Sequence, residues 1–482
     1  MKRTRLIWIL SAIVLLAAVS GGFALWHLHV RNQEIAAAVP RQPDLHGWNP
    51  ELKERIASAE RHAKHGPGRL AALAELSRLY HANGFYPEAS QCYKGLLQVD
   101  PKPLWAHRLA FLLAQFGDLQ HAIPLWRWVV KEDPKHIPAS IRLGDALLKD
   151  NHLNEAAVAY NRALKIAPGN PYAELGLARI DISQGKWSHA RTLLEAAAGS
   201  TDYAIGGDLL VTVYEHLGFA ERALVLRGAV KASGAFYDTP DSWLDGLYSD
   251  CYDVYRLTVY SGAADHSGDV PTAIKIAERA VSLDPGSGQV QYQMGNLCEE
   301  ANEPLKAMAA MKACIAASPQ FSDAWYQLYA LQRAAGNSAS ADQTLMAGLN
   351  ACPNSPALHL ELGNRLAQAG HIEQAIAQYR LSARLRPEEA DAQISLAALY
   401  FKLNRINEGV DELKAALVAQ PAQPAALTSI TMVYIKLGHE AEAQKWLRQV
   451  SFQPRIHDKQ REMLVQAFIQ QFGHPPEINL NQ

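Results

Sequence analysis

The sequence predicts an all-α solenoid, in which short helix pairs stack along one direction. Between Gly288 and Ala422 a proline recurs with a fixed step of 34 residues, at Pro319, Pro353, Pro387 and Pro421. Small residues and large apolar residues keep the same step ahead of the prolines, at Ala307, Ala341, Ala375 and Gly409 and at Met294, Leu328, Leu362 and Leu396. A period of this length is typical of repeat proteins, whose units bury their apolar faces against their neighbours.

Each repeating unit reads as two short amphipathic helices. Gly or Asn separates the two helices, and these residues adopt the left-handed conformation that ends a helix. Proline stops the second helix because it lacks an N–H and clashes with the preceding turn. Small residues such as Gly363 and Ala375 allow the paired helices to approach closely.

The unit beginning at Pro356 carries the most complete pattern: Leu362, Gly363, Gly370, Ala375, Tyr379 and Pro387. In residue type and spacing it resembles the tetratricopeptide repeat (TPR) family. The resemblance implies a right-handed superhelical solenoid of helix-turn-helix repeats. About five units fall in residues 70–231, starting near Leu70, Pro103, Ile137, Pro171 and Ala204. About six fall in residues 254–457, starting near Val254, Gly288, Ser322, Pro356, Ala390 and Pro424.

Two of these units fit the pattern less well than the others. The fourth has Asp202 where the closing proline is expected, and the fifth has Arg227 where an aromatic residue is expected. Residues 458–482 follow the last unit, and the apolar face over Lys459–Phe472 predicts a capping helix before a polar tail.

Residues 1–33 predict a transmembrane anchor. Lys2, Arg3 and Arg5 precede an uncharged run over residues 6–26, which is long enough to cross a bilayer as a helix. The positive residues before the run place the N-terminus in the cytoplasm and the remaining chain outside it, in the periplasm of a bacterial cell. We expect a single-pass inner-membrane protein; a signal peptide cleaved after residues 18–20 is the alternative.

Residues 34–69 are expected to form a linker with one short helix. Asn49 and Pro50 have the residue types of a helix N-cap and first helical position, and the helix should end near Gly66. This helix is interpreted as a spacer or as a cap on the first repeat.

The repeat register breaks at residues 232–253. This insert concentrates aromatic residues and carboxylates, and the candidate surface residues are Asp241, Trp243, Asp245, Tyr248 and Asp250. We favour a packing segment, with the aromatic rings on the ends of the flanking repeats and the acids in water. A partner-binding surface and an oxygen-rich cation site are the alternatives, although the acids lack the alternation of an EF-hand loop.

The sequence contains no motif that predicts catalysis, a cofactor or a metal ion. It has no HExxH, P-loop, GxSxG or CxxC motif, and histidines such as His136 are expected to face solvent. The net charge of −2 gives no indication of a nucleic-acid partner. Cys298 and Cys314 fall on facing positions of one repeat, where they could form a disulfide or serve as small buried apolar residues.

The resemblance to TPR proteins implies that the first helix of each repeat lines a groove for a peptide or protein segment. The family's ligand-contact positions correspond here to Tyr292, Asn296, Glu299, Tyr326, Arg333 and Asn364. Further contact positions are Ile394, Ala398 and Phe401 in the second block, and Arg78, His81, His107, Phe111, Tyr172 and Arg179 in the first. Some members bind a C-terminal carboxylate with a basic clamp, which places Lys or Arg at the fifth residue of the first helix. That clamp is absent here, because these positions hold Tyr292, Tyr326 and Leu360.

Together these features predict a non-enzymatic, membrane-anchored scaffold that binds a partner protein during envelope assembly. Cytochrome maturation, secretion and polysaccharide export are the processes that this layout resembles. A periplasmic holdase chaperone, a non-catalytic subunit of an enzyme complex, and an import-receptor topology with cytosolic repeats remain alternatives.

Overall fold

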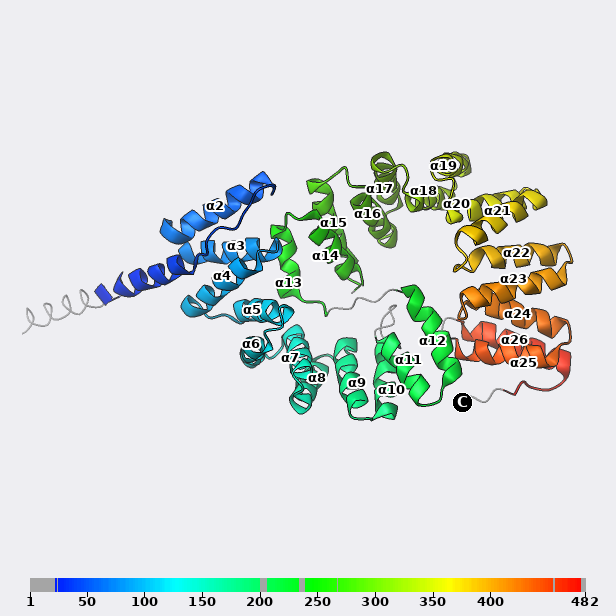
Figure 1. The fold of residues 1–482 in the computed structure, drawn as a ribbon, viewed down its shortest axis with the longest axis horizontal. Helices are drawn as coiled ribbons and strands as arrows, with labels where there is room; N and C mark the ends of the chain where they lie inside the picture. Colours follow the sequence, from blue (N-terminus) through cyan, green and yellow to red (C-terminus); the bar gives the residue numbers. More distant parts are fainter. Residues whose placement is uncertain are drawn as a thin grey trace, which may run out of the picture. The chain divides into compact units, whose positions relative to one another are not determined.

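The chain is helical throughout the part that the structure describes. The computed structural model describes residues 22–23, 25–199, 206–233, 239–266, 268–453 and 456–477, and these ranges contain no β-strand. They fall into two compact units (Figure 1). Unit 1 comprises Met1–Ala167 and Thr239–Tyr260, and unit 2 comprises Pro168–Asp238 and Ser261–Gln482.

Unit 1 starts with a helix over residues 25–38 and continues with three helix pairs. Its helices are α2 (Pro50–His65), α3 (Arg69–Ala82), α4 (Tyr86–Val99), α5 (Pro103–Gln115), α6 (Leu119–Glu132), α7 (Ile137–Lys149) and α8 (Leu153–Ile166). It also holds the short helix α13 (Ser242–Asp245), the 3₁₀ helix η1 (Gly246–Asp250) and the first part of α14 (Val254–His266).

Unit 2 contains the remaining helix pairs and the C-terminal helix. Its helices are α9 (Pro171–Ser183), α10 (Trp187–Gly199), α11 (Gly207–His216), α12 (Ala220–Ser233), α15 (Val270–Leu283), α16 (Gly288–Glu300), α17 (Pro304–Ala317), α18 (Ser322–Ala334), α19 (Ser338–Ala351), α20 (Pro356–Gln368), α21 (Ile372–Leu385), α22 (Asp391–Lys402), α23 (Ile406–Ala419), α24 (Pro424–Lys436), α25 (Glu440–Phe452) and α26 (Asp458–Phe472). The fourth and fifth repeats, α9–α10 and α11–α12, are helix pairs despite their weak patterns.

The turn inside each pair has the left-handed conformation that the sequence predicts. Positive φ angles recur at Gly84, Gly117, Asn151, Gly185, Gly218, Gly268, Asn302, Gly336, Gly370, Asn404 and Gly438. The step is 33 or 34 residues everywhere except between Gly218 and Gly268, where the insert lengthens it. The backbone therefore repeats with the sequence period.

Small residues on the first helices let the pairs close. A Cβ atom on Gly363 would lie 2.6 Å from the ring of Tyr379 on the second helix, and one on Gly144 would lie 2.6 Å from the ring of Tyr160. Both tyrosine hydroxyls then donate hydrogen bonds back to the first helix, Tyr379 to Asn364 and Tyr160 to Asp145.

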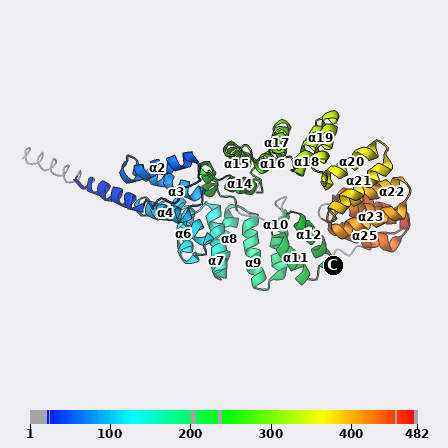
Figure 2. The ribbon, with the colours of Figure 1, turned by 45° about the horizontal axis from the view of Figure 1, so that its top comes forward.

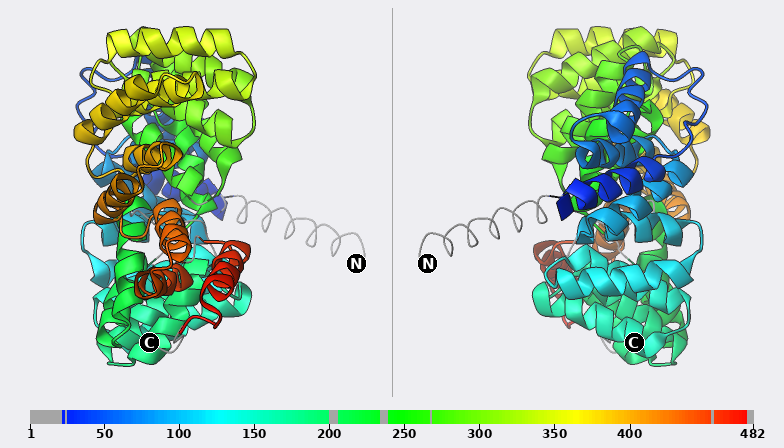
Figure 3. Two further views of the ribbon diagram at one scale, coloured as in Figure 1. Left: turned by 90° about the vertical axis from the view of Figure 1, so that its right-hand side faces the viewer. Right: turned by 90° about the vertical axis from the view of Figure 1, so that its left-hand side faces the viewer.

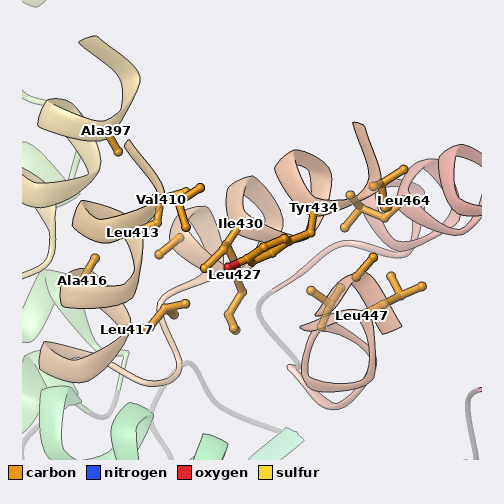
Figure 4. Close-up of a cluster of buried hydrophobic side chains, with 14 of the residues drawn as sticks. Ala397, Val410, Leu413, Ala416, Leu417, Leu427, Ile430, Tyr434, Leu447 and Leu464 are labelled. Carbon is orange, nitrogen blue, oxygen red and sulfur yellow. The ribbon is translucent and has the colours of Figure 1, made fainter. Parts of the chain in front are cut away.

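The C-terminal helix α26 packs on the last repeat. Buried side chains from α22, α23, α24, α25 and α26 meet in one cluster (Figure 4). Leu464 and Phe468 of α26 are almost fully buried in it, next to Ile430 and Tyr434 of α24. The last repeat thus buries its apolar face against α26 in place of a further repeat.

Neighbouring first helices contact one another directly in both units. In unit 1, α5 contacts α7; in unit 2, α18 contacts α20, and α20 contacts α22 (Figure 2). The end of unit 2 seen in Figure 3 shows the same succession of stacked helices over α20–α25. The side of each unit to which its first helices contribute is here called the first-helix surface of that unit.

The predicted membrane run over residues 6–26 lies outside the described residues, apart from its last few positions. No helix in the described ranges combines the length and the apolar character that a bilayer crossing requires. The predicted linker is not a free tether, because Ile35, Ala38 and Val39 are buried. Ala38 packs where a Cβ atom on Gly95 of α4 would lie only 2.1 Å away, and α2 packs on α3 as a cap.

No disulfide joins Cys298 to Cys314 in the described structure. Cys298 and Cys314 are fully buried in one apolar cluster with Ala307, Met311 and Leu328. Burial raises the pKa of both thiols above the ordinary value. They therefore act here as small apolar residues.

Candidate functional site

The first-helix surface of unit 2 carries a polar cavity of about 460 Å³. Three of the predicted ligand-contact residues, Tyr326, Arg333 and Asn364, line it. The other polar residues in its wall are Tyr329, Glu361, Gln368, Tyr379 and Lys402. The first helices α18 and α20 thus bring together predicted residues that lie up to 38 positions apart in the sequence, and α22 adds Lys402.

Asn364 is held in place but keeps hydrogen-bonding capacity. Its Oδ1 accepts a bond of 2.8 Å from Tyr379, and its Nδ2 donates one of 3.2 Å to Glu361. An amide has two donor hydrogens and two acceptor lone pairs, so one of each remains for the main chain of a bound segment.

The other predicted residues, Tyr292, Asn296 and Glu299, lie on α16 and do not line this cavity. The ring of Tyr292 packs on Phe321 with centroids 4.8 Å apart, and burial raises the pKa of its hydroxyl. Glu299 is exposed. The structure therefore extends the predicted surface over α16 without joining all six residues in one pocket.

A second cavity of about 360 Å³, apolar in character, lies beside α22, α24 and α26. The predicted contact residues Ile394, Ala398 and Phe401 line it. Its wall is completed by Ala397, Leu413, Thr428, Ser429, Met432, Val433, Gln460, Met463 and Leu464. Since α22 supplies Lys402 to the polar cavity and Ala398 to the apolar one, the two cavities are neighbours on the same surface.

In unit 1 the insert itself occupies the first-helix surface. Residues 239–253, here called the strap, contact α3 through η1 and α5 through α13. Asp241 is 2% exposed, and its Oδ2 accepts hydrogen bonds from His107 Nε2 at 2.6 Å and Arg142 Nε at 3.3 Å. Trp126 Nε1 donates to His107 Nδ1 at 3.3 Å, which leaves the ring proton on the nitrogen that faces Asp241.

The electrostatics around Asp241 follow from these partners. Although burial alone opposes ionisation, the His107 hydrogen bond and the charge of Arg142 lower the pKa of Asp241 to about 2. Burial, together with the neighbouring His107, lowers the pKa of His136 to about 4. Asp241 is therefore charged and His136 neutral near pH 7.

Trp243 fixes the middle of the strap. Its ring stacks on His136 with centroids 3.8 Å apart, and its carbonyl accepts a bond of 2.8 Å from Arg108 Nε. His136 consequently has only 8% of its side chain exposed, so the prediction that it faces solvent was wrong.

Asp250 anchors the other end of the strap. Its two carboxylate oxygens accept hydrogen bonds of 2.8 Å from Arg55 Nη2 and Arg78 Nε. The side-chain amide of Asn83 binds the main chain of the strap. It donates a hydrogen bond to the Asp250 carbonyl at 2.8 Å and accepts one from the Tyr252 N–H at 2.7 Å. Tyr252 then donates its hydroxyl to Glu51 at 2.7 Å.

The strap differs in two respects from the packing segment that the sequence suggested. It binds α2 and the first helices of the first three repeats, which are far from it in sequence. Asp241 and Asp250 are buried in ion pairs, so the expectation that the acids face water was wrong for both. Asp245 is exposed and Tyr248 half-buried, and a partner contact there stays a prediction.

A cation site in the strap has no support in the geometry. The described residues contain no group of three or more His, Cys, Asp or Glu side chains arranged to hold a metal ion. The two buried carboxylates already face the cations of Arg142, Arg55 and Arg78.

Sequence reasoning identified Arg78 and His107 as contact positions but missed the other strap ligands, among them Arg55 and Glu51 of α2 and Arg108, Arg142 and Asn83 of the repeats. Arg108 and Arg142 are each the sixth residue of their helix. In the family the fifth residue of this helix contacts the ligand, so both arginines lie one residue after a contact position. Asn83 is the C-cap of α3, so it lies after the helical residues that contact ligands in the family. The excess of carboxylates in the insert, set against arginines on the first helices, was the available signal.

Comparison with known proteins confirms the repeats. Family models described as tetratricopeptide repeat match residues 107–171, 147–202 and 360–424. The cellulose synthase operon protein C of Pseudomonas fluorescens (strain SBW25) is 22% identical over 455 residues. That alignment covers 83% of this chain but only 35% of the Pseudomonas protein, so the chain spans about a third of its relative.

Solved structures of helical-repeat proteins are similar in part. Yeast Tom70 has a TM-score of 0.40 at 14% identity, with 83% of this chain and 96% of that chain covered. The Cut9–Hcn1 hetero-tetramer of the APC/C gives 0.39 at 14% identity, with 86% and 98% covered. YrrB, described as a TPR protein with an unusual peptide-binding site, gives 0.29 at 17% identity, with 39% and 97% covered.

Proposed function

We propose that the chain is a TPR scaffold that binds a segment of a partner protein on the first-helix surface of unit 2. The observation that supports this most is the pair of neighbouring cavities on α18–α26, which are lined by residues at the family's ligand-contact positions. A single extended segment can reach both cavities, because α22 contributes to each of them.

The two cavities call for different side chains along that segment. The polar cavity offers the cations Arg333 and Lys402, the carboxylate of Glu361 and three tyrosine rings, which suits a polar residue and main-chain amides. The apolar cavity offers Ile394, Phe401 and Met432, which suits one large aliphatic or aromatic side chain. The favoured ligand is thus a segment with a polar half followed or preceded by an apolar anchor.

A membrane anchor at residues 6–26 would hold this scaffold at the outer face of the cytoplasmic membrane. The support is the length of the uncharged run and the three positive residues before it. Extraction of native membranes at alkaline pH tests the anchor: the full chain should stay in the pellet, and a chain starting at residue 34 should be released.

Envelope assembly is the process that we propose for the partner. The likeness to a cellulose synthase operon protein makes polysaccharide export the first pathway to examine, although it covers a third of that protein. The crosslinking experiment below is designed to identify the partner.

The proposal is tested by site-specific photo-crosslinking in native membranes. A benzophenone amino acid replaces Ala398, an exposed small residue in the apolar cavity, or Val418, which is 84% exposed on the second helix α23 of the same repeat. One or two partner proteins should crosslink at 398 and not at 418. Equal crosslinking at both positions, or none at 398, would refute a binding site in this cavity.

A holdase chaperone is the second candidate, because the apolar cavity and the exposed Met463 beside it could contact many unfolded chains. In the same experiment this function predicts a broad set of crosslinked clients at 398. It also predicts that the purified chain suppresses aggregation of an unrelated unfolded protein, which a specific scaffold would not do.

A further inference from the structure

We infer that the first-helix surface of unit 1 is a second peptide-binding site, and that the chain's own strap occupies it as a ligand in cis. The strap lies on the surface where TPR ligand positions fall, and two of those positions, Arg78 and His107, bind it directly. Unit 1 would then be a self-occupied receptor, separate from the binding surface proposed for unit 2.

Charge complementarity supports this inference. Residues 239–253 contain four aspartates and no basic residue. The surface beneath them presents Arg55, Arg78, Arg108 and Arg142, each of which bonds a strap carboxylate or carbonyl. Matching of opposite charge is a general determinant of specificity at binding surfaces.

The contacts of the strap are of two kinds, as in peptide recognition: some hold its main chain and others select its side chains. Asn83 bonds the strap's main chain through both its donor and its acceptor, and would do so for any residue type. Side-chain specificity comes from Asp241, from the ring of Trp243 on His136, and from Asp250, nine residues after Asp241.

The helix pairs of unit 1 also pack through residues of their own. α3 packs on α4, α5 on α6 and α7 on α8, and the largest buried residues, such as Tyr80, Tyr93 and Tyr160, lie between these helices. The strap itself has one turn of α-helix and one of 3₁₀ helix. Its attachment therefore depends on the contacts it makes with the receptor surface.

The strap defines the chemistry of a segment that could replace it. Such a segment would carry a carboxylate, a tryptophan two residues later and a second carboxylate nine residues after the first. A tethered ligand acts at an effective concentration on the order of millimolar, so a free segment has to bind tightly or arrive when the strap is weakened. The strap would therefore keep the site closed to weak acidic ligands.

The test uses the full chain with a strap that is disabled by Asp241→Ala, Trp243→Ala and Asp250→Ala. A fluorescent peptide of residues 239–253, with Cys251→Ser, is titrated and its anisotropy measured. The disabled chain should bind this peptide at least about tenfold more tightly than the unchanged chain, because the competing tethered ligand is gone. Arg78→Ala with Arg142→Ala in the disabled chain should remove the binding, and a peptide with Asp241→Asn and Asp250→Asn should not bind.

Two results would overturn the inference. One is a disabled chain that keeps its helical circular dichroism yet does not bind the peptide. The other comes from hydrogen exchange of the unchanged chain, which applies even if the disabled chain does not fold. If amides 242–252 exchange only together with those of α5 and α7, the strap is a fixed part of the core; exchange through a separate opening, increased by excess peptide, supports a replaceable ligand.

Discussion

Replacing Asp241 with alanine should destabilise unit 1 more than any other single change in the strap. The side chain of Asp241 is 1% exposed, and that of Arg142 beside it is 11% exposed. Removal of the carboxylate takes one ion pair away from a nearly buried guanidinium and takes the acceptor away from the His107 N–H. Breaking a buried pair by removing one partner costs about 3–5 kcal/mol, which is the loss that we expect.

Asp250→Ala is the matched comparison, because it removes the same group from the other end of the strap. Its partners Arg55 and Arg78 have 29% and 33% of their side chains exposed, so water can solvate both guanidinium groups after the change. The expected cost is therefore smaller, about 1–2 kcal/mol, from the lost charged hydrogen bonds.

Hydrogen exchange measures the two losses where they occur. The opening free energies of amides in α5 and α7 should fall for Asp241→Ala, and those in α3 should fall less for Asp250→Ala. Urea unfolding followed by circular dichroism gives the overall change. A loss below about 1 kcal/mol for Asp241→Ala, or a larger loss for Asp250→Ala, would show that burial of the partners does not set the cost.

Three further outcomes follow from the structure. The pKa of His136 is lowered to about 4 in the folded chain, so this histidine stays neutral at pH values where an unfolded histidine is protonated. The free energy of unfolding should therefore fall by about 3 kcal/mol as the pH drops from 6.5 to 4. The His136→Gln variant should show a weaker dependence of the urea midpoint on pH. Gly84→Ala should cost more than Gly117→Ala in thermal unfolding, although both glycines have positive φ. Only the Cβ atom at position 84 would displace the Arg256 guanidinium from its contacts with Tyr86 and Asp253; equal costs would contradict this. Ala398→Trp should abolish partner crosslinking from position 432 while changing stability by no more than about 0.5 kcal/mol, and retained crosslinking would exclude that cavity.

The repeats could be predicted because their period is local information. A proline, a glycine and a large apolar residue at fixed steps each dictate one feature of the backbone, and the left-handed turns at Gly336, Gly370 and Asn404 keep that step in the structure. Even the fourth and fifth repeats form helix pairs, because apolar spacing and the turn glycines Gly185 and Gly218 suffice without a closing proline.

The position of the strap could not be predicted in the same way. His107 and Asp241 are 134 residues apart, and Arg55 and Asp250 are 195 apart. The residues alone show that an acidic, aromatic segment interrupts the repeats, but several arginine-bearing helices could receive it. Which one does so depends on contacts between residues far apart in the sequence, and these form only in the folded chain.

The predicted groove residues show an intermediate case. Family positions located Tyr326, Arg333 and Asn364 on one cavity, because equivalent positions on successive first helices come together. They did not reveal that Tyr379, on a second helix, bonds Asn364 and also lines that cavity. Contacts that depend on side-chain length and direction were beyond a rule based on spacing.

The sixth residue of the first helix differs between the two units, and this difference explains why the two surfaces should select different ligands. The sixth residue of the first helix is Arg108 in α5 and Arg142 in α7, where it holds the acidic strap. In unit 2 the sixth residue is Gln327 in α18 and Glu361 in α20, and Glu361 lines the polar cavity. A carboxylate there would repel an acidic segment, since like charges placed together at an interface disfavour a partner. The strap peptide should therefore prefer the surface of unit 1, and its loss of binding in the Arg78→Ala, Arg142→Ala variant assigns it to that unit.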